Sequence, residues 1–144
     1  MAGELINQMF SDTAIKSPVI LMVEDDNDTR PMLKRLLNKQ GYRVILAFNE
    51  EDALERVGDG AFADLILING GLPSEEVLAA GRRIRERASF SANVPIIVVA
   101  SKFGEEMEGK DVHVGENDWI IYLVDAEQLQ NLIARVLPFH SQAG

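Results

Sequence analysis

The stretch that most constrains the fold is a short apolar run that ends in an asparagine and two glycines. Leu65 to Ile68 is followed directly by Asn69, Gly70 and Gly71, which is typical of a strand buried on both faces and closed by a tight turn. In open parallel sheets, ligand sites form at the carboxyl ends of such strands. The sequence therefore indicates Asn69 as a candidate site residue.

The rest of the chain alternates apolar strand runs with helical patterns. Four further strands are predicted at 18–23, 42–47, 94–99 and 119–124. Helices are predicted to begin at caps formed by Asn27 or Asp28, Asn49, Ser74 and Asp125. Three glycines interrupt the charged segment from Lys102 to Gly115, so we expect little or no helix there.

This alternation predicts an α/β fold of the flavodoxin-like, doubly wound class. We expect a five-stranded parallel sheet of order 2-1-3-4-5 with helices on both faces and a fourth helix that is short or absent. The domain is expected to span residues 18–138, between an N-terminal extension, 1–17, and a C-terminal tail, 139–144. Arg82, Arg83, Arg85 and Arg87 are expected to form a solvated helix face.

Length, charge and cysteine content exclude several classes of protein. The 144 residues suffice for one domain, and no apolar run is long enough to cross a bilayer. The net charge of -9 disfavours direct binding of nucleic acid. The chain has no cysteine and therefore neither disulfides nor thiolate metal ligands. We expect a cytoplasmic protein without membrane contact.

The predicted topology brings distant polar residues together. In the order 2-1-3-4-5, the first and third strands are neighbours at the switch point of the sheet. Their carboxyl ends would therefore place Glu24, Asp25 and Asn69 in one cleft.

These residues and their spacing resemble the receiver domains of bacterial two-component response regulators, over about residues 18–138. Glu24 and Asp25 match the acidic pair that holds magnesium in that family. The other three functional positions are replaced: Asn69 stands for the phosphorylated aspartate, Ala100 for a hydroxyl residue and Tyr122 for a lysine. The resemblance thus implies an atypical, or pseudo-receiver, domain.

Each replacement has a chemical consequence within this resemblance. An amide at Asn69 cannot form an acyl phosphate, and Tyr122 supplies no cation to neutralise a phosphoryl group. Glu24, Asp25 and a carbonyl such as that of Gly71 would hold at most a weak Mg²⁺ ion, so no cofactor is expected beyond that. Lys102 either pairs with one of the two acids or is a solvated loop lysine.

The resemblance implies a signalling module that works by phosphorylation-independent protein–protein interaction and is not an enzyme. Its partner would be another signalling protein or a second copy of itself. Trp119 and Tyr122 are the candidate partner surface, and Trp119 stands where the family has a switch aromatic. Two alternatives stay open: a phosphorelay receiver regulated by another modification, and a small-ligand-binding module that uses the acidic cleft.

Overall fold

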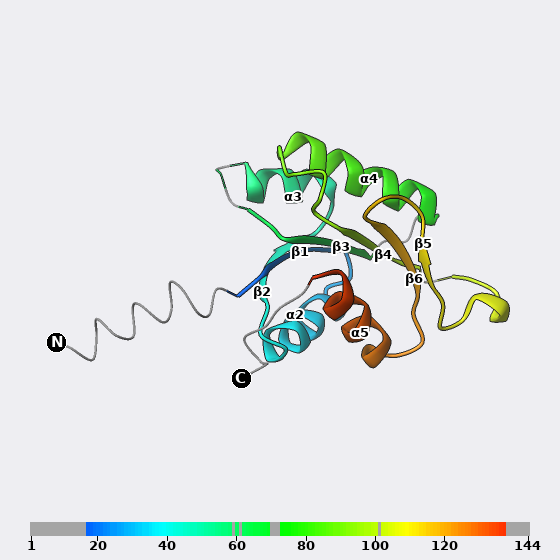
Figure 1. Ribbon diagram of the computed structural model, residues 1–144. Helices are drawn as coiled ribbons and strands as arrows, with labels where there is room; N and C mark the ends of the chain where they lie inside the picture. The colour runs from blue at the N-terminus through cyan, green and yellow to red at the C-terminus, as the bar shows by residue number, and fades with distance from the viewer. Residues whose placement is uncertain (1–16, 59, 61, 70–72, 101, 138–144) are drawn as a thin grey trace.

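One mixed sheet forms the centre of the molecule. The computed structural model describes residues 17–58, 60, 62–69, 73–100 and 102–137. Within these residues, six strands are ordered β2-β1-β3-β4-β6-β5 (Figure 1). Their bounds are β1, Val19–Glu24; β2, Arg43–Ala47; β3, Leu65–Asn69; β4, Ile96–Ala100; β5, Asp111–His113; and β6, Asp118–Tyr122.

Helices cover both faces of this sheet, as the doubly wound class requires. Figure 1 shows α3 and α4 on one face and α2 and α5 on the other. Their bounds are α2, Thr29–Lys39; α3, Glu50–Val57; α4, Ser74–Arg87; and α5, Ala126–Val136. None of the helices in the described residues is long and apolar enough to cross a membrane.

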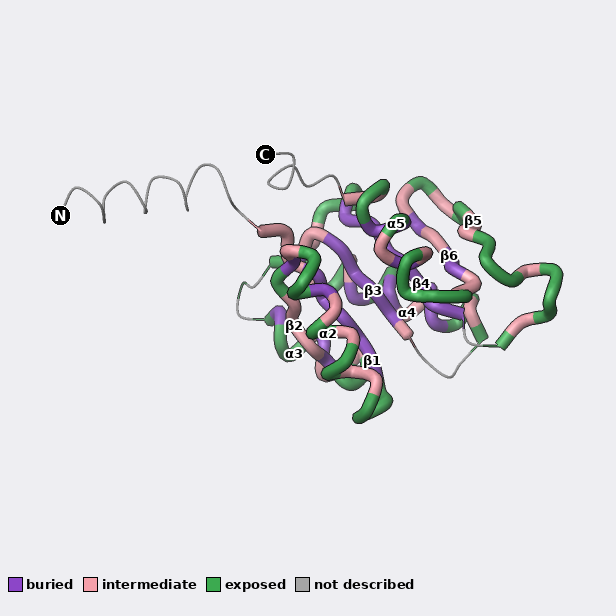
Figure 2. The backbone as a smooth tube through the Cα atoms, turned by 90° about the horizontal axis from the view of Figure 1, so that it is seen from below, coloured by how far each residue is buried: buried purple, intermediate pink, exposed green. Residues whose placement is uncertain are grey.

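Alternate strand residues build two separate apolar layers. Ile66 and Val98 belong to the cluster beneath α3 and α4, whereas Leu67 and Val99 belong to the cluster beneath α2 and α5. This division follows from the alternation of side chains along a strand. The central strands are accordingly buried along most of their length, as Figure 2 shows.

The close approach of α4 to the sheet depends on Gly81. A Cβ at this position would lie 3.0 Å from Ile68 Cδ1 and 3.0 Å from Ile96 Cγ2. The missing side chain therefore lets the helix axis lie nearer to β3 and β4 than any larger residue would allow.

The predicted number of five strands is wrong. The parallel strands β2-β1-β3-β4-β6 have the expected 2-1-3-4-5 order, but β5 adds a sixth, antiparallel strand beside β6. This strand has only three residues, too few for an alternating pattern to be recognised in the sequence. Gly109, with φ of +80°, turns the chain into it, and its N–H donates to the Tyr122 carbonyl.

The expectation of a short or absent fourth helix is confirmed in the described residues. Between Lys102 and Gly115, where only a 3₁₀ turn at Glu105–Met107 precedes β5, the described chain forms no α-helix. The edge of β6 is therefore covered by a strand instead of a helix.

The predicted helix caps are partly correct. Asn49 and Asp125 each accept a hydrogen bond from the backbone N–H three residues later, as expected of N-caps. Ser74 is not a cap: it is the first residue of α4, and Pro73 occupies the capping position without a side-chain bond. A proline there fixes φ near the helical value and needs no N–H partner.

Candidate functional site

Glu24 and Asn69 meet at the carboxyl ends of β1 and β3. The two residues are register partners in the parallel ladder. The Asn69 side-chain amide donates from Nδ2 to Glu24 Oε1 at 2.5 Å. Glu24 is only 2% exposed, so this contact satisfies a carboxylate that is withdrawn from solvent. The predicted convergence of these two residues is confirmed.

The second oxygen of Glu24 is also occupied. Its Oε2 accepts the backbone N–H of Asp26 at 3.1 Å. Burial raises the pKa of the Glu24 carboxyl above its ordinary value, and the hydrogen bonds from Asp26 and Asn69 partly offset that effect. The folded protein therefore binds a proton at Glu24 more tightly than the unfolded chain does.

Asp26 caps the helix that follows the acidic loop. Its Oδ2 accepts the Thr29 backbone N–H at 2.7 Å and also the Thr29 hydroxyl. These bonds hold the pKa of the Asp26 carboxyl below its usual range. The predicted caps, Asn27 and Asp28, are wrong, because Asp28 already has helical φ and ψ and makes no cap bond.

Arg30 connects this loop to the end of β2. Its Nη1 donates to the Glu24 carbonyl oxygen at 2.7 Å, and its guanidinium carbon lies 4.3 Å from the centroid of the Phe48 ring. The phenyl ring is thereby held at the rim of the site by a cation–π contact. Sequence reasoning missed both residues, because their contact joins α2 to a loop that lies beyond the next strand.

The described residues do not fit a magnesium site. Mg²⁺ needs several oxygen ligands. Both Glu24 oxygens already accept hydrogen bonds, and Asn69 presents its NH₂ group to Glu24 instead of an oxygen. Asp25 is exposed, and no group of three or more acidic or histidine side chains in the described residues is arranged to hold a metal. The remaining predicted ligand, Gly71, lies outside the described residues.

Ala100 and Tyr122 are register partners on β4 and β6. Ala100 is buried in the cluster beneath α3 and α4, and Tyr122 packs against the same cluster. The Tyr122 ring meets Phe103 edge to face, with centroids 5.4 Å apart. Lys102 is exposed and makes no ion pair with Glu24 or Asp25 in the described structure, which favours the solvated alternative.

Trp119 lies on the other side of β6. It packs against the cluster beneath α2 and α5. His113 on β5 stacks on the indole with centroids 4.4 Å apart, and the Arg135 guanidinium carbon lies 5.4 Å from the ring centroid. Trp119 and Tyr122 therefore project from opposite faces of the sheet and flank its β5–β6 edge.

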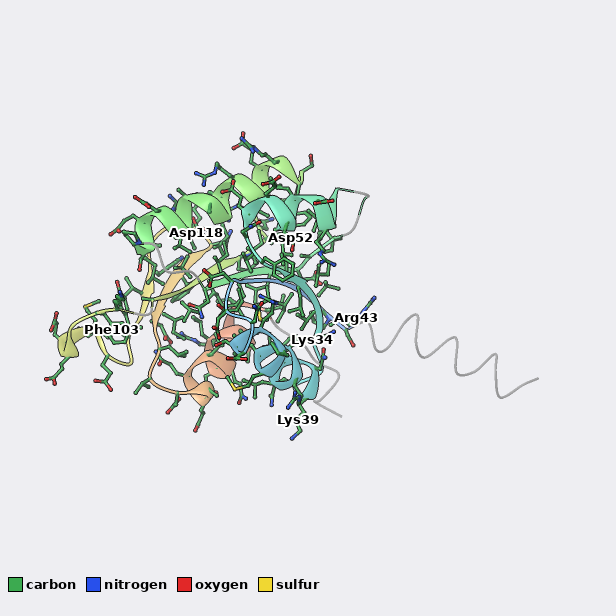
Figure 3. All side chains as sticks on the ribbon, turned by 180° about the vertical axis from the view of Figure 1, so that it is seen from behind. Lys34, Lys39, Arg43, Asp52, Phe103 and Asp118 are labelled. Carbon is green, nitrogen blue, oxygen red and sulfur yellow. The ribbon has the colours of Figure 1, made fainter. Side chains whose placement is uncertain are left out.

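A buried carboxylate joins β6 to α4 (Figure 3). Asp118 is only 3% exposed. Its Oδ2 accepts a hydrogen bond from Arg82 Nε at 2.9 Å and lies 2.8 Å from Arg82 Nη2. Its Oδ1 accepts a hydrogen bond from Arg85 Nη1 at 2.9 Å. The expectation that the arginines of this helix form a solvated face is thus wrong for Arg82 and Arg85, whereas Arg83 and Arg87 are exposed. Two arginines three positions apart on one helix face are the sequence signal for such a cluster, although nothing in the sequence identifies their partner.

Comparisons with known proteins identify the family to which this fold belongs. A family model described as response regulator receiver domain matches residues 20–134. The transcriptional regulatory protein DltR of Streptococcus agalactiae is 31% identical over 110 residues, which cover 76% of this chain and 47% of DltR. The transcriptional regulatory protein ZraR of Salmonella typhimurium is 27% identical over 125 residues, which cover 87% of this chain and 27% of ZraR.

A solved structure gives the same result for the fold. The chemotaxis protein CheY4 of Vibrio cholerae superposes with a TM-score of 0.62 at 25% identity, over 85% of this chain and 100% of that chain. By contrast, the chain spans about half of the length of DltR and less than a third of the length of ZraR.

Proposed function

We propose a phosphorylation-independent role in signal transduction for this chain, which belongs to the response regulator receiver domain family. In this proposal the domain transmits a signal by binding another protein or a second copy of itself. It acts without magnesium or another cofactor, without direct contact to nucleic acid or membrane, and without catalytic activity of its own.

The observation that carries the proposal is the bond from Asn69 to Glu24. Phosphoryl transfer needs a carboxylate nucleophile and charge neutralisation around the transferred group. At the end of β3, the chain instead offers an amide that donates to the buried acid of β1. This bond takes up the carboxylate oxygen that a cation would otherwise need. Glu24 is thus satisfied by the protein itself.

The proposed partner surface is the β5–β6 edge with its two flanking aromatic pairs. His113 and Trp119 stack on one face, and Phe103 and Tyr122 meet on the other. Trp and Tyr are enriched among the residues that dominate binding energy at interfaces. In the part of the chain that the structure describes, β5 is the last strand of the sheet, and an edge strand offers unpaired backbone groups to a partner chain.

Partner binding should be the same whether or not a phosphodonor is present. Immobilised full-length chain is exposed to a lysate of its host with and without Mg²⁺ and acetyl phosphate, and the retained proteins are quantified. Equal retention is expected, together with weaker retention by Tyr122→Ala at unchanged folded content. Self-association is tested on the same variant by sedimentation. Retention that rises with acetyl phosphate would contradict the proposal, and normal retention by a folded Tyr122→Ala variant would contradict the choice of surface.

Two other functions remain alternatives within the family. The first is a receiver that another covalent modification regulates, which would appear as a mass shift on the protein purified from its host. The second is a module that binds a small ligand near the acidic cleft, and a cavity beside Asn69 gives that alternative a specific form.

A further inference from the structure

A cavity of about 480 Å³ lies beside Asn69, between the ends of β1 and β3 and the helices α3 and α4. Val23 and Ile68 line it from the strands, and Ala79 and Ala80 line it from α4. The space exists because α4 has two small side chains where larger ones would fill the gap to α3. Phe48, 47% exposed, adds an aromatic ring to the lining. Cavities of this size and character accommodate small organic molecules.

The charged groups that line the cavity determine which ligand charge it can accept. Asp25, Glu50, Glu76 and Arg83 all line it. Arg83 binds both oxygens of Glu50, from Nε at 2.7 Å and Nη2 at 2.6 Å, so this pair is neutral overall. Asp25 and Glu76 form no ion pair in the described part of the chain. Two carboxylates are therefore left without a cation.

Asn69 adds a hydrogen-bond acceptor to the same wall. Its NH₂ group is used by Glu24, which leaves its carbonyl oxygen without a hydrogen-bond partner among the described residues. Asn69 as a whole is partly exposed and lines the cavity. A group with several N–H donors and a positive charge satisfies such an oxygen and the two carboxylates together.

We propose that this cavity binds a small organic cation with an apolar body, of the arylalkylamine class. The ammonium group lies toward Asp25, Glu76 and the Asn69 carbonyl oxygen. The aromatic body lies against Phe48 and the alanines of α4. An anion of the same shape is excluded, because it would meet two carboxylates without compensation. This inference does not depend on the proposed signalling function.

Three probes that share an indole ring test the proposal: tryptamine, which is cationic; tryptophol, which is neutral; and indole-3-propionate, which is anionic. Each is titrated into ¹⁵N-labelled full-length chain at neutral pH and low salt, and backbone amide shifts are followed. Tryptamine should give saturable shifts at the ends of β1 and β3 and in the first turn of α4. Its affinity should exceed that of tryptophol by about five- to tenfold, as expected for partly exposed charge pairs. Indole-3-propionate should not bind.

Charge-matched variants separate the site from the general acidity of the protein. Asp25→Asn and Glu76→Gln should bring tryptamine affinity close to that of tryptophol. Asp28→Asn and Glu75→Gln remove the same charge from exposed neighbouring positions outside the cavity and should leave it unchanged. Ala80→Leu, which fills the space, should abolish binding of both probes.

The proposal is overturned if no probe gives saturable shifts at the cavity. It is also overturned if the anion binds as well as the cation, or if the control variants weaken tryptamine as much as the cavity variants do. Should Ala80→Leu fail to fold, the cavity variants Asp25→Asn and Glu76→Gln still decide the question. Binding of tryptamine does not bear on phosphorylation, so failure here leaves the signalling proposal intact.

Discussion

Replacing Asn69 by aspartate is expected to lower the free energy of unfolding by about 2 to 3 kcal/mol at neutral pH in metal-free buffer. The substitution removes the N–H donor that satisfies the buried Glu24 carboxylate. It also puts a carboxylate oxygen where the amide nitrogen lies 2.5 Å from Glu24 Oε1. Millimolar Mg²⁺ should restore most of the loss, because Asn69→Asp provides the carboxylate set that the wild type lacks. Wild-type stability should not respond to Mg²⁺. Urea unfolding with and without EDTA measures both effects.

The control for this variant is Asn27→Asp. Asn27 is exposed in the same acidic loop, so the substitution adds the same charge nearby without facing Glu24. Asn27→Asp should change the free energy of unfolding by no more than about 0.5 kcal/mol. An Asn69→Asp variant that equals the wild type in EDTA would contradict the role given to the Asn69–Glu24 bond.

The loss of unfolding free energy in the Asn69→Asp variant should become smaller as the pH falls. The pKa of Glu24 is already raised above its ordinary value of 4.5 by burial. A second carboxylate beside it raises it further. Between the unfolded and the folded pKa, the native state binds more protons than the unfolded state, so stability rises as the pH is lowered through that interval. The variant should therefore approach the wild type at acidic pH.

Replacing Asp118 by asparagine is expected to cost about 2 to 3 kcal/mol of unfolding free energy. A fully buried pair broken on one side loses about 3 to 5 kcal/mol, and this value is reduced here because the Arg82 side chain is 48% exposed. The amide keeps the shape of Asp118 but turns one acceptor into a donor that faces an arginine. Denaturant unfolding at neutral pH gives the difference.

The matched control is Glu50→Gln, which breaks another carboxylate–arginine pair that involves α4, between Glu50 at the start of α3 and Arg83 of α4. Glu50 binds Arg83 with two hydrogen bonds, but both side chains are more exposed than Asp118. Glu50→Gln should lower the free energy of unfolding by about 1 kcal/mol or less. If Glu50→Gln destabilises the protein more than Asp118→Asn does, the Arg82–Asp118–Arg85 cluster does not anchor α4 to β6.

Much of the site follows from the sequence because it depends on strands with unmistakable apolar runs. The runs before Glu24 and Asn69 predict two buried parallel strands, and the doubly wound topology makes these strands neighbours. Their carboxyl ends must then lie side by side. The direction of the hydrogen bond between the two side chains follows from their chemistry, since only the amide can donate to a carboxylate.

The parts that could not be predicted depend on contacts between residues far apart in the sequence. Asp118 lies 36 positions from Arg82 and 33 from Arg85, and their pairing follows from how α4 crosses the sheet. Strand β5 is stabilised by its pairing with β6 and by the glycine turn before it, not by its own pattern. In the acidic loop, several side chains are chemically able to cap α2, and backbone geometry alone selects Asp26.

The intact mass of the wild-type chain after incubation with Mg²⁺ and acetyl phosphate shows directly whether this domain can be phosphorylated. An active receiver domain treated in parallel shows that the donor is competent. We predict no base-labile addition of a phosphoryl group, because Asn69 has no carboxylate nucleophile and Tyr122 supplies no cation. Asn69→Asp should label poorly for the second reason alone. Stoichiometric labelling of the wild type on any carboxylate would contradict the phosphorylation-independent role.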